Sequence, residues 1–179
     1  MSRIVVFAGL AGHGKDTAAA VLMENGFQRA PLAGPLKDMI RTVLRARDYR
    51  PDIIERLVDG DLKETPHEAF GGNTCRVAMQ KLGTEWGRAL FGEKFWLDTW
   101  SIQHCQPANY VVADCRFANE AGYLNRLGAE IYLVRRPGFV GGAGQHASED
   151  LAWAKGLEVL WNDFATAEEF QDSIRARFF

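Results

Sequence analysis

Residues 9–17 have the types and the spacing of a phosphate-binding turn. The segment reads Gly-Leu-Ala-Gly-His-Gly-Lys-Asp-Thr and directly follows the apolar run 4–8. Glycines let successive backbone N–H groups approach an anion, the lysine reaches the outer phosphates, and the following helix turns its positive end toward them. We therefore expect a nucleoside triphosphate to be bound by Gly9, Leu10, Ala11, Gly12, His13, Gly14, Lys15, Asp16 and Thr17.

One position of this turn departs from the usual pattern. The residue after the lysine is commonly Ser or Thr, whose hydroxyl meets Mg²⁺, but here it is Asp16, with Thr17 one place later. Because an aspartate beside a triphosphate is repelled unless a cation lies between them, we predict that Asp16 contacts Mg²⁺ directly or through water. Asp16 could instead only stabilise the helix N-terminus, and Thr17 could meet the metal or an inner phosphate.

A second polar group follows the apolar run 110–113. Asp114 is placed there to hold metal-bound water or to accept a proton from an acceptor group. ATPases of this type commonly place a water-activating glutamate after that aspartate, whereas here Cys115 and Arg116 follow. The sequence therefore disfavours a dedicated ATPase.

Five arginines are candidates for binding phosphate groups. Arg76, Arg88 and Arg116 indicate forked recognition of an acceptor phosphate. Arg135 and Arg136 precede a glycine-rich segment and could clamp the transferring phosphoryl group when that segment closes. Each arginine could instead be a solvated or structural ion-pairing residue.

Aromatic residues and one histidine have two interpretations each. Trp86, Trp96 and Trp100 could form a pocket for an acceptor base, but their near-helical spacing is more typical of a core. His146 could orient a lid contact, whereas Ser148 could equally cap a helix that begins after it and ends near residue 155.

Composition places the chain among ordinary soluble globular proteins. Its 179 residues suit one domain, 47% are hydrophobic, 25% are charged, and the net charge is -2. No basic excess suggests nucleic acid or an anionic membrane as a partner, and no apolar stretch approaches the length of about 18 residues that spans a bilayer. The three cysteines lack a CxxC spacing and favour a reducing compartment. We expect a cytoplasmic protein.

The order of the predicted elements is typical of an α/β fold, with a parallel sheet covered by helices on both faces. Strands are expected at 4–8, 110–113, 131–134 and 157–160, and helices at 15–24, 34–47, 75–82, 84–91, 93–102, 118–127 and 166–177. Residues 48–72 predict a short helix followed by surface loops. Polar residues follow three of these strands: the turn 9–17, the segment 114–116 and the pair 135–136. Because parallel strands end at one edge of the sheet, these three polar clusters should converge there.

Several segments together resemble the deoxynucleoside monophosphate kinases of bacteriophages, within the P-loop nucleoside monophosphate kinase group. The resemblance spans nearly the whole chain and rests on 9–17 with its Gly-Lys-Asp-Thr ending, 32–37, 76–88, 114–120, 134–137 and 146–149. It implies one P-loop kinase domain over 1–179, of three layers, with a helical acceptor-binding region at 34–105 and a mobile lid at 135–150. Residues 49–72 match no segment of that family.

This resemblance implies transfer of the γ-phosphoryl group of ATP to a deoxynucleoside monophosphate, with Mg²⁺. It makes Lys15, Asp114 and Arg136 catalytic, and adds Arg135 to the ATP-binding turn. On the acceptor side it places Lys37, Arg76, Trp86, Arg88, Asp114, Arg116 and Glu120. Asp16 or Thr17 would hold the metal. A homodimer is one assembly it allows, and a phage-encoded protein would act in the host cytoplasm.

Two other functions remain as alternatives. A kinase of another small phosphorylated acceptor, such as dephospho-coenzyme A, would need the same turn and the same arginines. A nucleotide-dependent switch or assembly protein has less support, because the chain has no Asn-Lys-x-Asp guanine-binding motif and no glutamate after Asp114. The acceptor distinguishes the first alternative, and phosphate release without an acceptor distinguishes the second.

Overall fold

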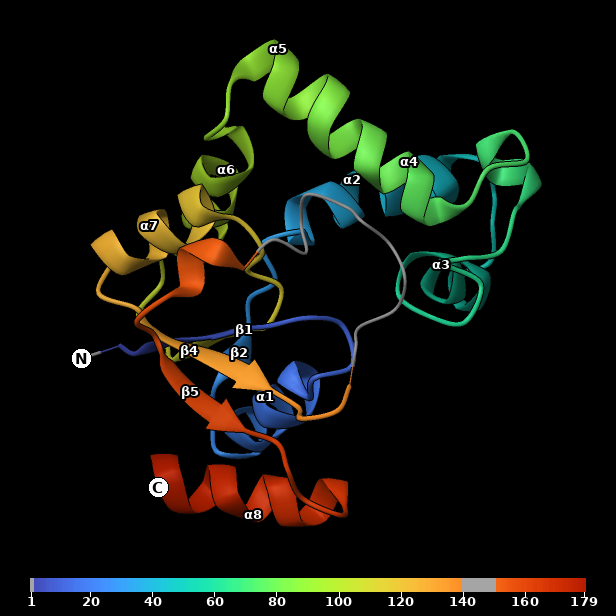
Figure 1. Ribbon diagram of the computed structural model, residues 1–179. Coiled ribbons are helices and arrows are strands. Elements are labelled where there is room, and N and C mark those ends of the chain that lie inside the picture. Colours follow the sequence, from blue (N-terminus) through green and yellow to red (C-terminus); the bar gives the residue numbers. More distant parts are fainter. Residues whose placement is uncertain (1, 140–150) are drawn as a thin grey trace. The chain divides into compact units, whose positions relative to one another are not determined.

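A computed structural model describes residues 2–139 and 151–179 of the protein. The chain forms two compact units (Figure 1). The sheet unit comprises Met1–Pro31 and Gln106–Phe179, and the helical unit comprises Leu32–Cys105. The helical unit includes the whole of the region 34–105 for which the resemblance implied a helical structure.

In the part of the chain that the structure describes, the sheet unit is built on five parallel strands, which confirms the predicted α/β fold class. The strands are β1 (Ile4–Ala8), β2 (Gln28–Arg29), β3 (Tyr110–Val112), β4 (Glu130–Arg135) and β5 (Glu158–Trp161), in the order β2-β3-β1-β4-β5. Val5 pairs with Val111 on one side and with Glu130 on the other. The chain therefore crosses over β1 between β3 and β4, and such a switch point is where ligands bind in open α/β sheets.

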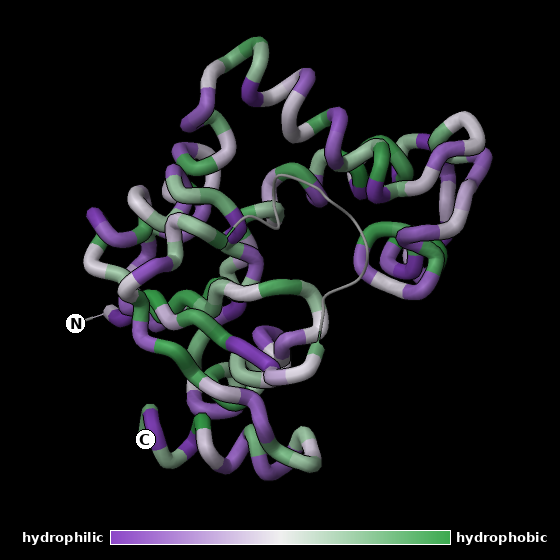
Figure 2. The backbone as a smooth tube through the Cα atoms, in the orientation of Figure 1, coloured by the Kyte–Doolittle hydropathy of each residue, from purple (hydrophilic) through white to green (hydrophobic). Residues whose placement is uncertain are grey.

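The burial of the central strand β1 explains its apolar sequence. Val5 to Ala8 are all 0% exposed, because β1 has a strand on each side and a packed layer on each face. A strand buried in this way reads as a continuous apolar run. In Figure 2 the strands β1 and β4 are accordingly among the green segments of the sheet unit.

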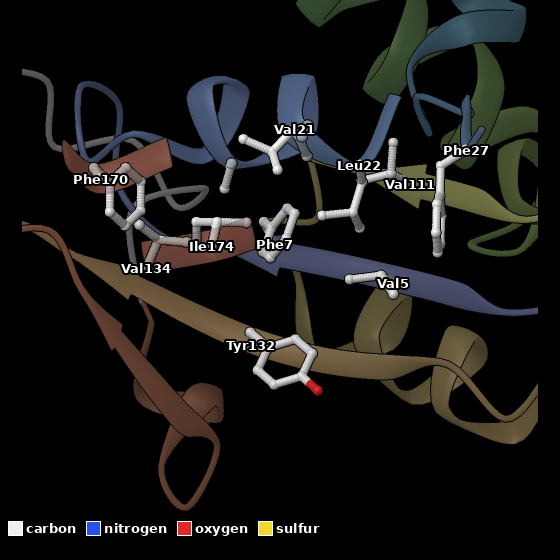
Figure 3. Close-up of a cluster of buried hydrophobic side chains, with 13 residues drawn as sticks. Val5, Phe7, Val21, Leu22, Phe27, Val111, Tyr132, Val134, Phe170 and Ile174 are labelled. Carbon is white, nitrogen blue, oxygen red and sulfur yellow. The ribbon is translucent and has the colours of Figure 1, made fainter. Parts of the chain in front are cut away.

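One face of the sheet packs on α1 (Lys15–Glu24) and α8 (Ala167–Phe178). Phe7 of β1 meets apolar side chains from both helices in a single core, which Figure 3 shows between α1 and the strands. Phe170 and Ile174 of α8 are buried there at the i, i+4 spacing of one helix face. Residue Thr166 caps α8 by accepting the N–H of Glu169 at 3.2 Å.

The opposite face carries a second apolar cluster. Ala8 and Leu133, which are register partners in β1 and β4, pack there with Ala154 of the 3₁₀ turn η4 (Ala152–Ala154). Helix α7 (Ala118–Arg126) contacts β4. Figure 1 shows α7 and α8 on opposite sides of the strands, so helices cover both faces as predicted.

The helical unit consists of α2 (Gly34–Ala46), α3 (Pro51–Val58), η1 (Glu68–Phe70), α4 (Cys75–Lys81), η2 (Leu82–Arg88), α5 (Ala89–Phe91) and α6 (Phe95–Gln103). Its core begins with Leu36, Ile40 and Leu44, which follow one another at i, i+4 along α2 and meet Ile54, Leu57 and Val58 of α3. The short helix and loops expected over 48–72 are confirmed by α3 and η1.

The prediction of two separate helices at 75–82 and 84–91 is wrong. Thr74 does cap the first, by accepting the N–H of Val77 at 3.2 Å, but the helical run continues through the π-helical segment η2 into α5. The indole N–H of Trp96 donates to the Gly83 carbonyl at 2.9 Å within this segment. The Gly83 carbonyl thus accepts a hydrogen bond from a side chain outside the helix. The wider π-helical turn accommodates this bond, and the helix continues past Gly83.

Two further expectations have clear outcomes. Trp96 and Trp100 are 8% and 1% exposed, so the core interpretation holds for both. A helix was expected to end near residue 155. The described residues of that region, from 151 on, form only the short 3₁₀ turn η4. His146, Ser148 and Glu149 lie outside the described residues.

Gly87 tests the packing of the π-helical segment. A Cβ at this position would lie 2.3 Å from Nε1 of Trp96, a buried ring that cannot move away easily. Gly87→Ala should therefore lower the free energy of unfolding of the helical unit by about 1–3 kcal/mol. Urea titration followed by tryptophan fluorescence measures the loss.

A helical glycine with room around it is the matched control. A Cβ at Gly122 in α7 would meet only Arg126, at 3.8 Å. Gly122→Ala should raise the free energy of unfolding by about 0.5–1 kcal/mol. Equal stability of the Gly87→Ala variant and the unsubstituted protein would contradict the packing argument.

Candidate nucleotide-binding site

The turn between β1 and α1 has a backbone that only glycine adopts easily. Gly9, Gly12 and Gly14 have φ angles of 142°, 79° and 101°. A Cβ at Gly9 would lie 2.5 Å from the Val134 carbonyl oxygen, and one at Gly14 would lie 2.6 Å from Nδ2 of Asn162. The glycines therefore allow both the conformation of the turn and its close approach to β4 and to the segment after β5.

The N-terminus of α1 is prepared for an anion. Its N-cap is Gly14, which offers no side chain to accept the N–H groups of the first turn. Unsatisfied N–H groups at a helix N-terminus, with the helix dipole behind them, bind phosphate well. The predicted phosphate cradle thus has a fitting backbone in the structure.

Lys15 completes this cradle. Its Nζ donates to the Leu10 carbonyl at 2.7 Å, so the side chain folds back over the turn. Burial, and then the positive charge of Arg116, lower the pKa of the Lys15 amine to about 8, against the opposing effects of Asp16 and Asp114. A bound triphosphate would give the Lys15 ammonium group a negatively charged partner.

The same interactions bring together residues that the sequence left far apart. Lys15 lies within electrostatic reach of Asp114 and Arg116, which follow β3, and β3 is the neighbour of β1 in the sheet. Parallel strands end at a common edge, and this explains the convergence. Arg135 ends β4 at that edge too, and both Arg135 and Arg136 are exposed.

His13 has a role that the sequence did not reveal. Its ring is 6% exposed, and Nδ1 lies 3.2 Å from the Val134 carbonyl oxygen, an arrangement that suits an Nδ1–H donor. Its Nε2 has no hydrogen-bond partner. The ring also meets Phe139 edge-on, with 6.0 Å between centroids. His13 therefore fastens the cradle to the end of β4.

Asn162 is a second site residue that the sequence reasoning missed. Its Nδ2 donates to the His13 carbonyl at 3.0 Å, and its backbone N–H donates to the Arg135 carbonyl at 2.7 Å. One asparagine thus joins the segments that follow β1, β4 and β5. Asn162 directly follows the observed strand β5, but it lies two residues beyond the predicted strand 157–160, whereas Asp114 and Arg135 directly follow their predicted strands.

Glu120 supports the turn that carries Arg116. Its carboxylate accepts the backbone N–H groups of Arg116 at 2.8 Å and Phe117 at 3.1 Å, and the residue is 8% exposed. The indole of Trp153 donates to the Arg116 carbonyl at 3.1 Å. Glu120 thus holds the backbone of Arg116, and its contact with a substrate stays a prediction.

The oxygen donors around the cradle suit Mg²⁺. Asp16 is exposed and forms an ion pair with Arg29 of β2, and Thr17 follows it on α1. Within residues 2–139 and 151–179, no group of three or more His, Cys, Asp or Glu side chains could hold a metal alone. Magnesium in nucleotide sites is usually held by one or two carboxylates together with phosphates and water, and Asp16, Thr17 and Asp114 could supply that smaller set.

The remaining predicted residues lie in the helical unit. Lys37 pairs with Asp59, and Arg76 pairs with Glu64. Half-buried Arg88 ends the π-helical segment η2. Half-buried Trp86 belongs to an aromatic cluster with Phe91, Phe95 and Trp96. Of the predicted lid 135–150, residues 140–150 lie outside the described residues.

Comparison with known proteins supports the resemblance seen in the motifs. The chain is 27% identical over 185 residues to a protein of Acanthamoeba polyphaga mimivirus named "Putative deoxynucleotide monophosphate kinase", covering 96% of this chain and 93% of that protein. The predicted resemblance to the deoxynucleoside monophosphate kinases is thereby confirmed. The similarity supports kinase activity in this chain. No family model matches it.

Two solved structures are more distant. TT1252 of Thermus thermophilus is 20% identical, with 99% of this chain and 98% of that chain covered and a TM-score of 0.39. An unliganded sugar kinase of Janibacter sp. HTCC2649 is 13% identical, with 98% and 94% covered and a TM-score of 0.41. Both TM-scores are below 0.5.

No helix in the described residues is long and apolar enough to cross a membrane.

Asn162 should control the affinity for ATP. Asn162→Ala removes the hydrogen bond to the His13 carbonyl, and the cradle should then lose part of its fixed conformation. We expect the ATP dissociation constant to rise about fivefold, the scale of one hydrogen bond. Calorimetric titration with a non-hydrolysable ATP analogue measures this change. Asn125→Ala, an exposed site on α7, is the control and should bind normally. Equal affinities for the two variants would contradict the role of Asn162.

Lys15 should make ATP binding weaker at alkaline pH. Its pKa is about 8 in the ligand-free protein, and the charge of a bound triphosphate should raise that pKa. Above pH 8 binding then requires proton uptake, so the dissociation constant should rise by up to about tenfold per pH unit, while Lys15 adds no pH dependence well below 8. Titrations from pH 7 to 9.5, in buffers of different ionisation enthalpy, measure both effects. Lys15→Arg should abolish the uptake, and constant wild-type affinity would refute the assignment.

Proposed function

We propose that the protein transfers the γ-phosphoryl group of ATP to a deoxynucleoside monophosphate. The observation that carries this proposal is the glycine cradle at the start of α1, with the lowered-pKa amine of Lys15 folded over it. Phosphoryl transfer depends mostly on positioning and on neutralising charge, and the cradle supplies both. The name of the mimivirus relative supports a deoxynucleoside monophosphate as the acceptor.

Each group of the sheet unit has a role in this proposal. The cradle, Lys15 and Arg135 bind the donor phosphates, and Arg136 neutralises charge on the transferring group. Asp114 orients the acceptor hydroxyl or metal-bound water. Asp16, Thr17 or Asp114 would hold Mg²⁺, and the bound ion would supply positive charge against the negative charge of the phosphates. Arg116 is assigned to the acceptor, as are Lys37, Arg76 and Arg88 of the helical unit.

The residue after Asp114 supports transfer over hydrolysis. Cys115 is 0% exposed, and burial raises the pKa of its thiol far above the ordinary value. A neutral buried thiol cannot activate water as the usual glutamate would. A kinase of another phosphorylated acceptor keeps all of these features, and the choice of acceptor is therefore the decisive measurement.

Assay with a panel of acceptors tests the proposal. The protein is incubated with ATP and Mg²⁺ and each deoxynucleoside monophosphate, the ribonucleotides, dephospho-coenzyme A or no acceptor, and products are separated by ion-exchange chromatography. We expect ADP and a deoxynucleoside diphosphate in equal amounts. Product from dephospho-coenzyme A alone, or phosphate release without any acceptor, would replace the proposal by one of its alternatives.

Lys15→Met should separate catalysis from folding. The substitution keeps the volume and removes the charge that stabilises the transferring group, so kcat should fall by roughly a hundredfold or more. Because the half-buried amine has a depressed pKa in the free protein, the variant should unfold at the same temperature as the unsubstituted protein or higher. Lys94→Met, at an exposed site, is the control for activity. Normal turnover by Lys15→Met would refute the cradle assignment.

A further inference from the structure

A group of positive side chains in the helical unit includes one residue that no motif assigned. Lys37 comes from α2, Arg76 from α4, and Lys63 from the loop after α3, inside the stretch 49–72 that matches no segment of the family. The backbone connects two of them, because the N–H of Arg76 donates to the Lys63 carbonyl at 3.2 Å. The amine of Lys63 interacts electrostatically with both Lys37 and Arg76.

The other cations of this group have carboxylate partners. Lys37 pairs with Asp59, and Arg76 pairs with Glu64. Arg41 is held by Asp38, Glu55 and Asp59. Within the described residues, the half-buried Lys63 amine has neither an ion pair nor a hydrogen bond, although Asp59 lies close enough to favour its charge.

We propose that Lys63 binds the phosphate of the acceptor nucleotide, together with Lys37 and Arg76. The inference depends on the proposed function for the identity of the ligand. The geometry supports it because the backbone contact between Arg76 and Lys63 joins α4 to the loop after α3, and the Lys63 amine there adds a charge that pairs with no carboxylate in the described residues. A phosphomonoester dianion is the ligand that such a group binds best, with a forked contact to Arg76 and point charges from the two lysines.

The state of the Lys63 amine agrees with this role. Burial, and then the charges of Lys37 and Arg76, lower its pKa, against the opposing effect of Asp59. The nearby Cys75 thiol adds no negative charge at neutral pH, because burial raises its pKa to about 11. An incoming phosphate would offset the repulsion among the three cations. It would also give the segment 49–72 a part in binding.

Chemical labelling of the whole protein tests the proposal without any turnover. Brief reductive methylation near pH 8, followed by mass spectrometry of peptides, reports the reactivity of each lysine. Lys63 should be modified readily, and a deoxynucleoside monophosphate should shield it at lower concentrations than inorganic phosphate does. Exposed Lys94 and Lys155 serve as internal controls. Shielding no better than an equal ionic strength of chloride gives would overturn the proposal.

A pair of variants gives the second measurement. Lys63→Met should raise the dissociation constant for the monophosphate about tenfold, the scale of a hydrogen bond between charged groups, and should leave ATP affinity unchanged. Lys81→Met, at an exposed lysine beside Glu85, is the control. An unchanged constant for the monophosphate, or an equal loss for ATP, would refute the role of Lys63.

The outcomes also separate this inference from the proposed function. If deoxynucleoside monophosphates are phosphorylated but Lys63→Met binds and reacts normally, the inference fails and the kinase assignment stands. If Lys63 is shielded by a monophosphate that the protein never phosphorylates, the binding role stands and the proposed reaction fails.

Discussion

The candidate site depends on one physical constraint, which is that a phosphate must be met by backbone N–H groups with no side chain in the way. The turn before α1 satisfies it with Gly9, Gly12 and Gly14, all at positive φ. Such a backbone loses the most conformational entropy on folding, and within the turn the bonds from Lys15 and His13 to the Leu10 carbonyl oppose this loss only in part. The surrounding structure must therefore hold it.

The strand order supplies this support. Since β4 lies beside β1, its last carbonyls are within reach of the turn, and the His13 ring takes the Val134 carbonyl. The segment after β5 then adds Asn162, which joins the His13 carbonyl to the Arg135 backbone. The close contacts at Gly9 and Gly14 also show that the turn and its surroundings depend on each other, because any larger residue there would displace Val134 or Asn162. Binding and packing are thus two consequences of one set of contacts.

Much of this arrangement was predictable from local signals. Continuous apolar runs identified β1, β3 and β4, because central parallel strands are buried on both faces. The cradle was evident from glycine and lysine spacing. The contacts of His13 and Asn162 were not, because each depends on which strands are neighbours, and periodicity carries no information about strand order. The continuation of α4 into η2 was missed for a related reason: a ring thirteen residues further along, Trp96, takes the carbonyl of Gly83.

The positively charged side chains fall into two groups, those paired with carboxylates and those that we propose to bind a ligand. Arg41, Arg56 and Arg175 have carboxylate partners, and the hydrogen bonds of these pairs raise the pKa values of the three arginines. Lys15 and Lys63 have lowered pKa values, with burial as the largest cause in each. A lysine responds to burial in this way more readily than an arginine, whose charge is delocalised and always present. The two lysines lie in different units, one in the cradle and one in the helical unit. The proposed reaction, between two phosphorylated substrates, requires two sites of this kind, and this is the physical reason for proposing the donor at one lysine and the acceptor at the other.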